Sequence, residues 1–375
     1  MENYMEKLKK INGSGQCAFV LAIAEKIMQY EELKIESEVY NFAKKAIEVY
    51  WYWLNNEIIL EYLDIYSTLS EDVGYIEHNE MICSIIGKYE AEEDFFSDCM
   101  KLMDKYGDDA DICNKYVLMA KIFLILALHV QGKEIEYYDL DTEVYEIGDE
   151  FIQDFIEKTL KQKIINEYEL HLLLDYLNQK HSSYCEICRD DVIATVKNKN
   201  KMFIEKGYKL RNYRRVNASG QCAFALMIAE KVLNSEKLDK TETLYQFAEE
   251  KIAYCWKWLN GEIKGKENIE KVIYAEDENK NIYLSRCWHK EDEKNQLYVI
   301  VCNAIDIVEE RATLPYDEYN YMDNALSIQM SEPIKRNIIT EEEYNNLMEH
   351  LDNTYPNYPA ISKKEIMGLL EKTEI

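Results

Sequence analysis

The stretch INGSGQCAFVLAIAEKI at residues 11–27 returns 205 residues later as VNASGQCAFALMIAEKV at residues 216–232. The match continues at the same spacing and without a gap through NFAKKAIEVYWYWLNNEI in the first half and QFAEEKIAYCWKWLNGEI in the second. Over the 48 aligned positions, 24 residues are identical. Self-similarity of this length is the signature of a repeated structural unit. We therefore expect two tandem copies of one domain.

A second pair of matching stretches lies near the end of each half. IINEYELHLLLDYL at 164–177 aligns with IITEEEYNNLMEHL at 338–351, and Tyr184 then falls on Tyr358. The spacing here is 174 rather than 205, so the first copy holds 31 residues that the second lacks. This difference predicts an insertion in the first copy, somewhere between about 60 and 121.

The duplication predicts two domains, at 1–205 and 206–375. Each is long enough to bury a core of its own. The stretch KNKNKMFIEKGYKLRNYRR at 197–215 is polar and basic, which is typical of a linker or an exposed connecting helix.

Helices should dominate both copies, so we predict an all-α fold. The chain has only four prolines and twelve glycines, too few for the closely spaced turns of a sheet protein. The first helix of each copy should begin at a serine N-cap, Ser14 or Ser219. In the second helix, apolar residues recur at steps of three and four, which predicts a broad buried face: Tyr40, Ala43, Ile47, Trp51 and Leu54, with Phe42, Val49 and Trp53 beside them. Residues 281–288 and their counterpart near 72–76 have little helical pattern and are expected to form a loop or a short strand.

The composition favours a soluble cytoplasmic protein. The most apolar run, 116–130, is about as long as one core helix and contains Lys121, so we expect no membrane span. The N-terminal residues lack the apolar segment of a secretion signal. The ten cysteines are scattered through apolar stretches and are expected to be reduced and mostly buried.

The most enzyme-like feature is the Ser-Gly-Gln-Cys-Ala-Phe motif at Cys17 and Cys222, because a helix N-terminus lowers the pKa of a thiol. A catalytic cysteine also needs a base, usually histidine. None of the six histidines has a histidine at the aligned position of the other copy; His129, for example, faces Asn303. A duplicated nucleophile without a duplicated base favours a structural role. We therefore expect no catalytic residue, with both sulfurs buried at the helix starts and no imidazole within hydrogen-bonding reach.

The sequence predicts neither a metal site nor a cofactor. Cys185 and Cys188 have the spacing of half a zinc site, but no second pair of soft ligands follows, and the other copy has Pro359 and Ser362 in their place. Phosphate-binding glycine loops, zinc-protease motifs and dinucleotide fingerprints are all missing from the sequence. The Trp-x-Trp pairs at 51–53 and 256–258 could stack on a ligand, but tryptophans on an apolar helical face more often belong to the core.

Charge distinguishes the two copies. The chain has a net charge of −27. Residues 1–205 hold 21 basic and 41 acidic side chains, a net of −20, whereas residues 206–375 hold 23 and 30, a net of −7. Within the first copy, residues 61–157 contain 25 acidic and 6 basic side chains, a net of −19. Such a field repels phosphates, so we expect no binding to nucleic acid.

Acidic residues mixed with aromatic ones mark the expected partner-binding surface, because charge steers a basic protein and rings anchor it. A solvated acidic helix face is the alternative explanation. We predict that a partner docks on the first copy across about 89–146, through Glu90, Glu92, Glu93, Asp94, Phe95, Phe96, Asp108, Asp109, Asp111, Tyr137, Tyr138, Asp139, Asp141, Glu143 and Tyr145.

The repeated block resembles the all-helical immunity proteins of bacterial polymorphic-toxin systems, specifically the sixth immunity-protein class. Their pattern is an apolar helix ending in Ala-Glu-Lys, followed by a helix ending in Trp-x-Trp-Leu. Both copies match it, with the lysines at Lys26 and Lys231 and the tryptophan pairs named above. The resemblance covers about 48 residues of each copy well and the rest loosely. It does not indicate which copy would bind a toxin.

The resemblance implies a protein without enzymatic activity that neutralises a cognate toxin by stoichiometric binding. The acidic surplus agrees with this expectation, because a toxin that acts on nucleic acid has a basic cleft. A helical adaptor or regulatory protein-binding module is the alternative, and a cysteine-dependent hydrolase is a third reading. The sequence leaves the toxin's chemistry and the oligomeric state of the chain open.

Overall fold

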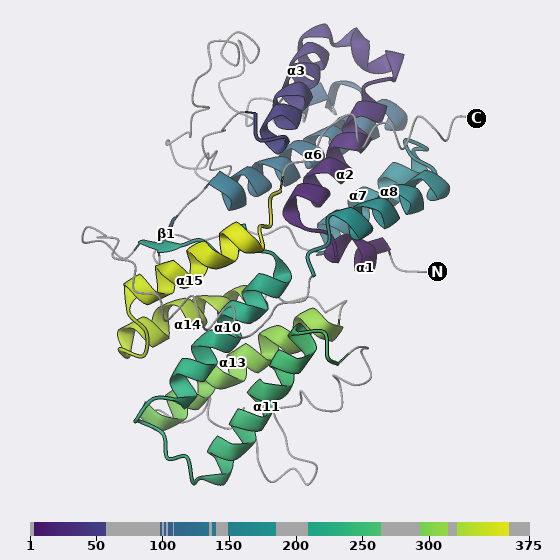
Figure 1. Ribbon diagram of the computed structural model, residues 1–375. Coiled ribbons are helices and arrows are strands. Elements are labelled where there is room, and N and C mark those ends of the chain that lie inside the picture. The colour runs from purple at the N-terminus through teal and green to yellow at the C-terminus, as the bar shows by residue number, and fades with distance from the viewer. Residues whose placement is uncertain are drawn as a thin grey trace. The chain divides into compact units, whose positions relative to one another are not determined.

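The computed structural model describes residues 4–57, 98–99, 101–102, 104–107, 109–134, 137–139, 149–184, 209–263, 293–313 and 321–359. As predicted, the chain is mostly helical (Figure 1). It divides into two compact units, and each is described by itself. The first, unit 1, is built mainly from the N-terminal half, and the second, unit 2, from the C-terminal half.

Unit 1 is a bundle of helices around a central helix, α2. Its elements are α1 (Tyr4–Lys9), α2 (Gly13–Ile27), the 3₁₀ helix η1 (Glu31–Ile35), α3 (Ser37–Leu54), α6 (Ala110–Glu134), α7 (Asp149–Lys161) and α8 (Glu167–Lys180). Helix α2 packs against α3, α6 and α8. Its middle, from Cys17 to Ala24, is apolar on every side, and each of these residues is at most 3% exposed. A helix without a polar face has to lie inside the core.

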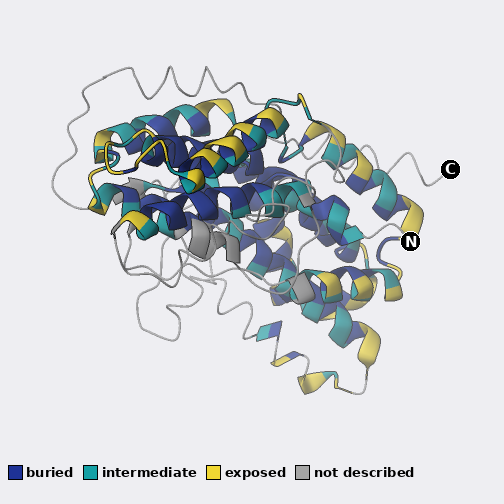
Figure 2. Cartoon of the chain, turned by 90° about the horizontal axis from the view of Figure 1, so that it is seen from below, coloured by how far each residue is buried: buried dark blue, intermediate teal, exposed yellow. Residues whose placement is uncertain are grey.

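The predicted buried face of α3 is confirmed. Ala43, Ile47, Trp51 and Leu54 are all buried, as are the neighbouring Phe42, Val49 and Trp53, whereas Tyr40 is only partly buried. Figure 2 shows the general pattern, in which buried residues occupy the inward faces of the helices and exposed residues the outer ones.

Unit 2 is also a bundle of helices, packed around helix α10. Its elements are β1 (Tyr137–Asp139), β2 (Lys209–Arg211), the 3₁₀ helix η3 (Tyr213–Arg215), α10 (Ala218–Leu233), α11 (Thr243–Leu259), α13 (Glu293–Thr313), α14 (Tyr321–Lys335) and α15 (Glu341–Thr354). Helix α10 packs against α11, α13, α14 and α15. Fifteen of its sixteen residues are buried.

A two-stranded antiparallel sheet joins the described strands of unit 2. In it, Tyr137 pairs with Arg211, Tyr138 with Leu210 and Asp139 with Lys209. Strand β2 also lies against α15, where the Tyr344 hydroxyl donates to the Arg211 carbonyl over 3.2 Å. The short sheet was not expected, and the segments for which a strand was considered, near 72–76 and 281–288, lie outside the described residues.

Two local predictions were wrong. The N-caps of α2 and α10 are Asn12 and Asn217, not the serines two residues later. Each asparagine side chain accepts from a backbone N–H three residues on, over 2.9 Å, which asparagine does as well as serine. The described end of the expected linker, residues 209–215, is also not an exposed linker but packs against the rest of unit 2. Tyr213 is only 3% exposed, and Arg215 pairs with Asp352 over 2.9 Å.

The units differ from a division of the chain at residue 205. Among the described residues, Tyr137–Asp139 and Ser183–Tyr184 belong to unit 2 although they precede that point, and Tyr358 and Pro359 belong to unit 1 although they follow it. The insertion expected between 60 and 121 falls largely on residues outside the described ranges.

Residues Ala110–Val130 of α6 are long and apolar enough, by length and composition, to cross a membrane. Core helices of soluble proteins pass the same test, and 56% of the most apolar window is buried in the structure. Because α6 packs against α2 and α7, its apolar residues fill the core of unit 1.

Candidate functional site

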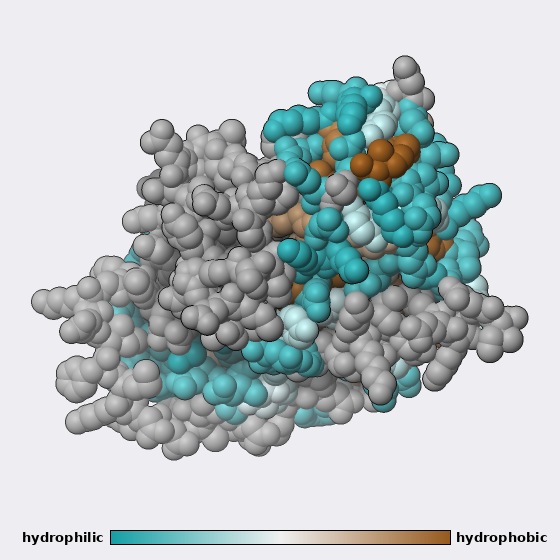
Figure 3. Space-filling view, turned by 90° about the horizontal axis from the view of Figure 1, so that it is seen from above, coloured by the Kyte–Doolittle hydropathy of each residue, from teal (hydrophilic) through white to brown (hydrophobic). Residues whose placement is uncertain are grey.

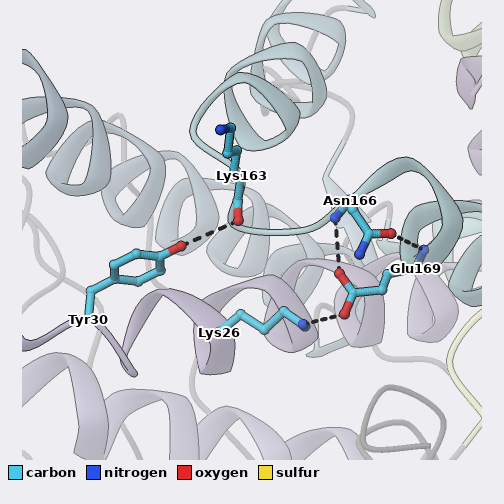
Figure 4. A network of polar contacts seen from close by, with 5 residues as sticks. All are labelled: Lys26, Tyr30, Lys163, Asn166 and Glu169. Atoms are coloured by element: carbon cyan, nitrogen blue, oxygen red, sulfur yellow. Dashed lines mark hydrogen bonds and ion pairs between the residues drawn. The ribbon is translucent and has the colours of Figure 1, made fainter. Parts of the chain in front are cut away.

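The Ala-Glu-Lys motif of unit 1 joins α2 to α8 through a buried ion pair. Lys26 at the end of α2 lies 2.7 Å from a carboxylate oxygen of Glu169, and both side chains are largely buried (Figure 4). The other Glu169 oxygen accepts from the backbone N–H of Asn166, whose side chain accepts in return from the Glu169 N–H. This reciprocal capping box starts α8. The Glu169 carboxylate thus stabilises both the start of α8 and the contact between α8 and α2.

A shallow pocket of about 380 Å³ lies beside this network. Tyr30 reaches across it and donates to the Lys163 carbonyl over 3.3 Å. Lys163 has a positive φ of 56°, which turns the chain between α7 and α8. The pocket is lined by groups that already pair with one another, so its geometry serves the helix junction.

The second half of the motif is also structural. The Trp51 indole N–H donates to Glu25 over 3.2 Å, which ties α3 to α2. Trp53 is 0% exposed, and Trp256 of unit 2 is 3% exposed, so the expectation that the tryptophans belong to the core is confirmed for these three. Trp258 is partly buried and packs on the core of unit 2.

Unit 2 contains a corresponding ion pair, which joins α10 to α15. Lys231 pairs with Glu343 over 2.6 Å, and Glu343 closes a capping box with Thr340 at the start of α15. Burial raises the pKa of Glu343, but the hydrogen bonds from Lys231 and from the Thr340 N–H outweigh it and hold that pKa below its usual value. The indole N–H of Trp256, in contrast to that of Trp51, has no hydrogen-bond partner among the described residues.

The cysteines at the helix starts are buried, as predicted. Cys17 and Cys222 are each 0% exposed. Burial raises the pKa of the Cys17 thiol well above its usual value, although the charge of Lys133 opposes this. The helix N-terminus therefore does not activate Cys17, since a thiolate there would be desolvated.

Most of the residues predicted to bind a partner lie outside the described residues. The predicted residues that are not described are Glu90, Glu92, Glu93, Asp94, Phe95, Phe96, Asp108, Asp141, Glu143 and Tyr145. Of the remainder, Tyr137, Tyr138 and Asp139 form β1 and are paired through their backbone with the basic strand β2 of unit 2. Asp109 and Asp111 lie at the start of α6 in unit 1. The structure thus places the described members of the predicted surface in different units.

Asp109 and Asp111 are exposed and complement the N-terminus of α6. The Asp109 carboxylate accepts from the backbone N–H groups of Asp111 and Ile112, each over 3.2 Å. Negative charge is favourable at this end of a helix. Asp109 is therefore a helix cap as well as a surface charge.

Sequence reasoning missed a second source of charge beside this helix start. Glu36, just before α3, accepts from the Tyr106 hydroxyl over 2.5 Å and pairs with Lys105. These two hydrogen bonds hold the pKa of Glu36 below its usual value. Tyr106 in turn stacks on Tyr116 of α6, with ring centroids 6.4 Å apart. The acidic residues around η1 and α3 are thereby fixed next to α6.

We name the resulting surface of unit 1 the acidic edge. It comprises Glu31, Glu32, Glu36, Glu38, Asp109 and Asp111, of which all but Glu36 are exposed. Ile35 of η1 lies in the same stretch with 65% of its surface exposed. The described surface in Figure 3 is mainly hydrophilic, with small separate hydrophobic areas. The acidic edge thus combines charge with one large exposed apolar side chain.

Comparison with known proteins found no family model that matches the chain, and no curated protein or solved structure that is similar to it.

Proposed function

We propose that this chain is a bacterial immunity protein that neutralises a cognate toxin by direct stoichiometric binding in the cytoplasm, without enzymatic activity, metal or cofactor. The observation that carries the proposal is the acidic edge, which combines five exposed carboxylates with the exposed Ile35. Charge would steer a basic partner toward unit 1, and apolar contact would slow its release.

The partner we propose is a basic protein, such as a toxin that acts on nucleic acid. Its active-site cleft must attract phosphates, so a protein that carries carboxylates can occupy the same cleft. The same carboxylates disfavour nucleic acid as the ligand of this chain. Asp109 and Asp111 belong both to the acidic edge and to the predicted docking segment 89–146, so the two would overlap at the start of α6.

We further propose that the two halves are tandem copies of one helical domain. Aligned residues have matching local roles, which supports this proposal. Asn12 and Asn217 cap the central helices, and both are followed after four residues by a glutamine that donates to the carbonyl just before the cap. The ion pairs of Lys26 and Lys231 each end on a capping-box glutamate.

The roles of the motif residues bear on the resemblance to immunity proteins. Lys26, Glu25 and Trp51 join α2 to its neighbours, so the motif would define the scaffold and not the toxin-binding surface. Recognition would then lie on residues outside the motif.

The test uses the full chain and the toxin encoded beside its gene. Replacing Glu32, Glu38 and Asp111 together by lysine changes three exposed carboxylates of the acidic edge. Association with the toxin should slow, and cells that produce the toxin should lose protection. The matched control replaces Glu236, Glu250 and Glu342, which are exposed carboxylates of unit 2, and should leave binding near wild type.

Growth protection without a one-to-one complex would contradict the proposal. A complex with a partner that has no toxic activity would support the adaptor alternative instead. Catalytic turnover of the toxin that disappears in Cys17→Ser or Cys222→Ser would support the hydrolase reading.

A further inference from the structure

Tyr358, near the C-terminal end of the described chain, packs among the helices of unit 1. We call the group of residues that contacts such a tyrosine its seat. Its hydroxyl lies 3.2 Å from Nδ1 of His129, and its ring lies 5.9 Å from the His129 ring and 6.5 Å from that of Trp53, centroid to centroid. These partners come from α6 and α3. The partly buried phenol therefore has both a polar partner and aromatic neighbours.

Two glycines make room for this ring. A Cβ at Gly13, the first residue of α2, would lie 2.5 Å from the Tyr358 ring, and a Cβ at Gly132 of α6 would lie 2.5 Å from its hydroxyl. Neither glycine has an unusual φ, so the reason for glycine is space and not backbone conformation. Any larger residue at either position would displace the tyrosine.

In unit 2 the chain around Ser183 and Tyr184 lies at the start of α10. The Ser183 hydroxyl accepts from the Ala218 N–H over 3.1 Å, and its carbonyl accepts from the Ser219 N–H over 3.2 Å. Together with the Asn217 cap, these bonds satisfy donors that a helix start otherwise leaves free. Burial raises the pKa of Tyr184, while the charge of Arg311 opposes this, so the phenol lies beside α13.

The two tyrosines occupy aligned positions of the two halves, because Tyr358 follows Tyr184 by the spacing of 174. Each is preceded by the same kind of contact within its own half. An antiparallel bridge joins Ser182 to Ile11, and another joins Pro356 to Val216. Ser183, one residue after the first bridge, belongs to unit 2, and Tyr358, two residues after the second bridge, belongs to unit 1.

From this arrangement we propose that each unit carries a binding site for an extended segment with a tyrosine, and that the chain fills both sites by reciprocal exchange, each half supplying the segment of the other. Exchange of an identical element between copies is the principle of domain swapping. Here both copies lie in one chain.

The two seats are related but not identical. Gly13 aligns with Ala218, and Gly132 aligns with Asp306. The polar neighbour is His129 in unit 1 and Arg311 in unit 2. Such differences favour the exchanged arrangement over self-insertion, since Tyr184 would not find the residues of its present seat in unit 1. The exchange rests on the proposed duplication of the two halves but does not depend on toxin binding.

The test replaces Tyr358 or Tyr184 of the full chain by p-azidophenylalanine, which has nearly the shape of tyrosine and cross-links to its neighbours on illumination. Cross-links of monomeric protein are then located by peptide mass spectrometry. Position 358 should link to peptides of α2 and α6, and position 184 to peptides of α10 and α13. The reverse pattern, with 184 linked to α2 or α6, would show that each half keeps its own segment and would overturn the proposal.

Hydrogen exchange provides an independent readout. In full-length Tyr358→Ala, amides of α2 and α6 should exchange about tenfold faster or more while those of α10 and α13 stay near wild type, and Tyr184→Ala should do the opposite. Tyr168→Ala is the matched control, because Tyr168 is 67% exposed, and should change neither set. Faster exchange confined to a variant's own half of the chain would contradict the exchange.

Discussion

Lys26 and Glu169 stand 143 residues apart in sequence and 2.7 Å apart in space. Their side chains are 13% and 9% exposed, so the pair is shielded from water on both sides. Since Glu169 also closes the capping box of α8, the pair joins the end of the central helix to the start of another. The equivalent pair of unit 2, Lys231 and Glu343, is more exposed, at 22% and 34%.

Lys26→Met should destabilise unit 1, because it keeps the side-chain stem but leaves the Glu169 carboxylate without its cation. Removing one partner of a shielded ion pair costs about 3 kcal/mol. Lys231→Met should cost less, since its pair is better solvated. The loss of stability in each variant is measured by urea denaturation, with hydrogen exchange of the amides in each unit as the readout. Lys34→Met is the control, because the Lys34–Glu31 pair is exposed, and should change little.

The N-caps of the two central helices offer a paired test. Asn12→Ala and Asn217→Ala should each lower the free energy of unfolding by about 1 kcal/mol, and substitution by serine should restore most of the loss. Thermal unfolding monitored by circular dichroism gives the values. Equal stability of the alanine variants and the wild type would mean that these caps contribute nothing.

The helical core was predictable because its signal is local and repeated. The apolar period of α3 and the all-apolar middle of α2 each predict burial without knowledge of their neighbours. The N-cap was misplaced by two residues because asparagine and serine are both good caps, and the sequence offers Asn12 and Ser14. In the structure, the Asn12 side chain accepts from the Gly15 backbone N–H. Short-range patterns thus set the helices but not their ends.

The seats of the two tyrosines and the acidic edge could not be predicted in the same way. The alignment placed Tyr184 opposite Tyr358, yet which unit receives each ring depends on contacts between residues more than 100 positions apart. Glu36 reaches the start of α6 only through Tyr106, 70 residues later. A linear scan for acidic clusters finds Asp109 and Asp111 and misses the carboxylates that the fold brings beside them.

Asp306 of α13 should make the stability of unit 2 depend on pH. Burial, with smaller contributions from Glu309 and Glu310, raises its pKa to about 7, although the Cys302 thiol donates to it over 3.6 Å. An unfolded aspartate titrates near about 4, so between about pH 4 and 7 the folded state holds more protons than the unfolded state. The free energy of unfolding should therefore fall as pH rises through this window.

Asp306→Asn removes that dependence. The variant should gain on the order of 1 to 3 kcal/mol over the wild type at pH 8 and show little gain at pH 4. Urea titrations at both pH values measure the difference. A gain that is the same at pH 4 and pH 8 would show that desolvation of this carboxylate is not the cause.

Thiol labelling tests the assignment of the repeated cysteines. Cys17 and Cys222 should react with a thiol reagent only as fast as the protein unfolds, since both are fully buried, whereas the partly buried Cys113 should react sooner. Peptide mapping after timed labelling at pH 7 separates the three sites. Rapid alkylation of Cys17 in the folded chain would indicate an accessible, activated thiol.

The most direct test of the proposed function is the association rate of the full chain with its toxin at low and at physiological ionic strength. The account predicts a one-to-one complex whose association slows steeply as salt rises, with a rate lowered about tenfold in the Glu32, Glu38 and Asp111 lysine variant and unchanged in the unit 2 control. Equal association rates for all three proteins, without dependence on salt, would contradict it.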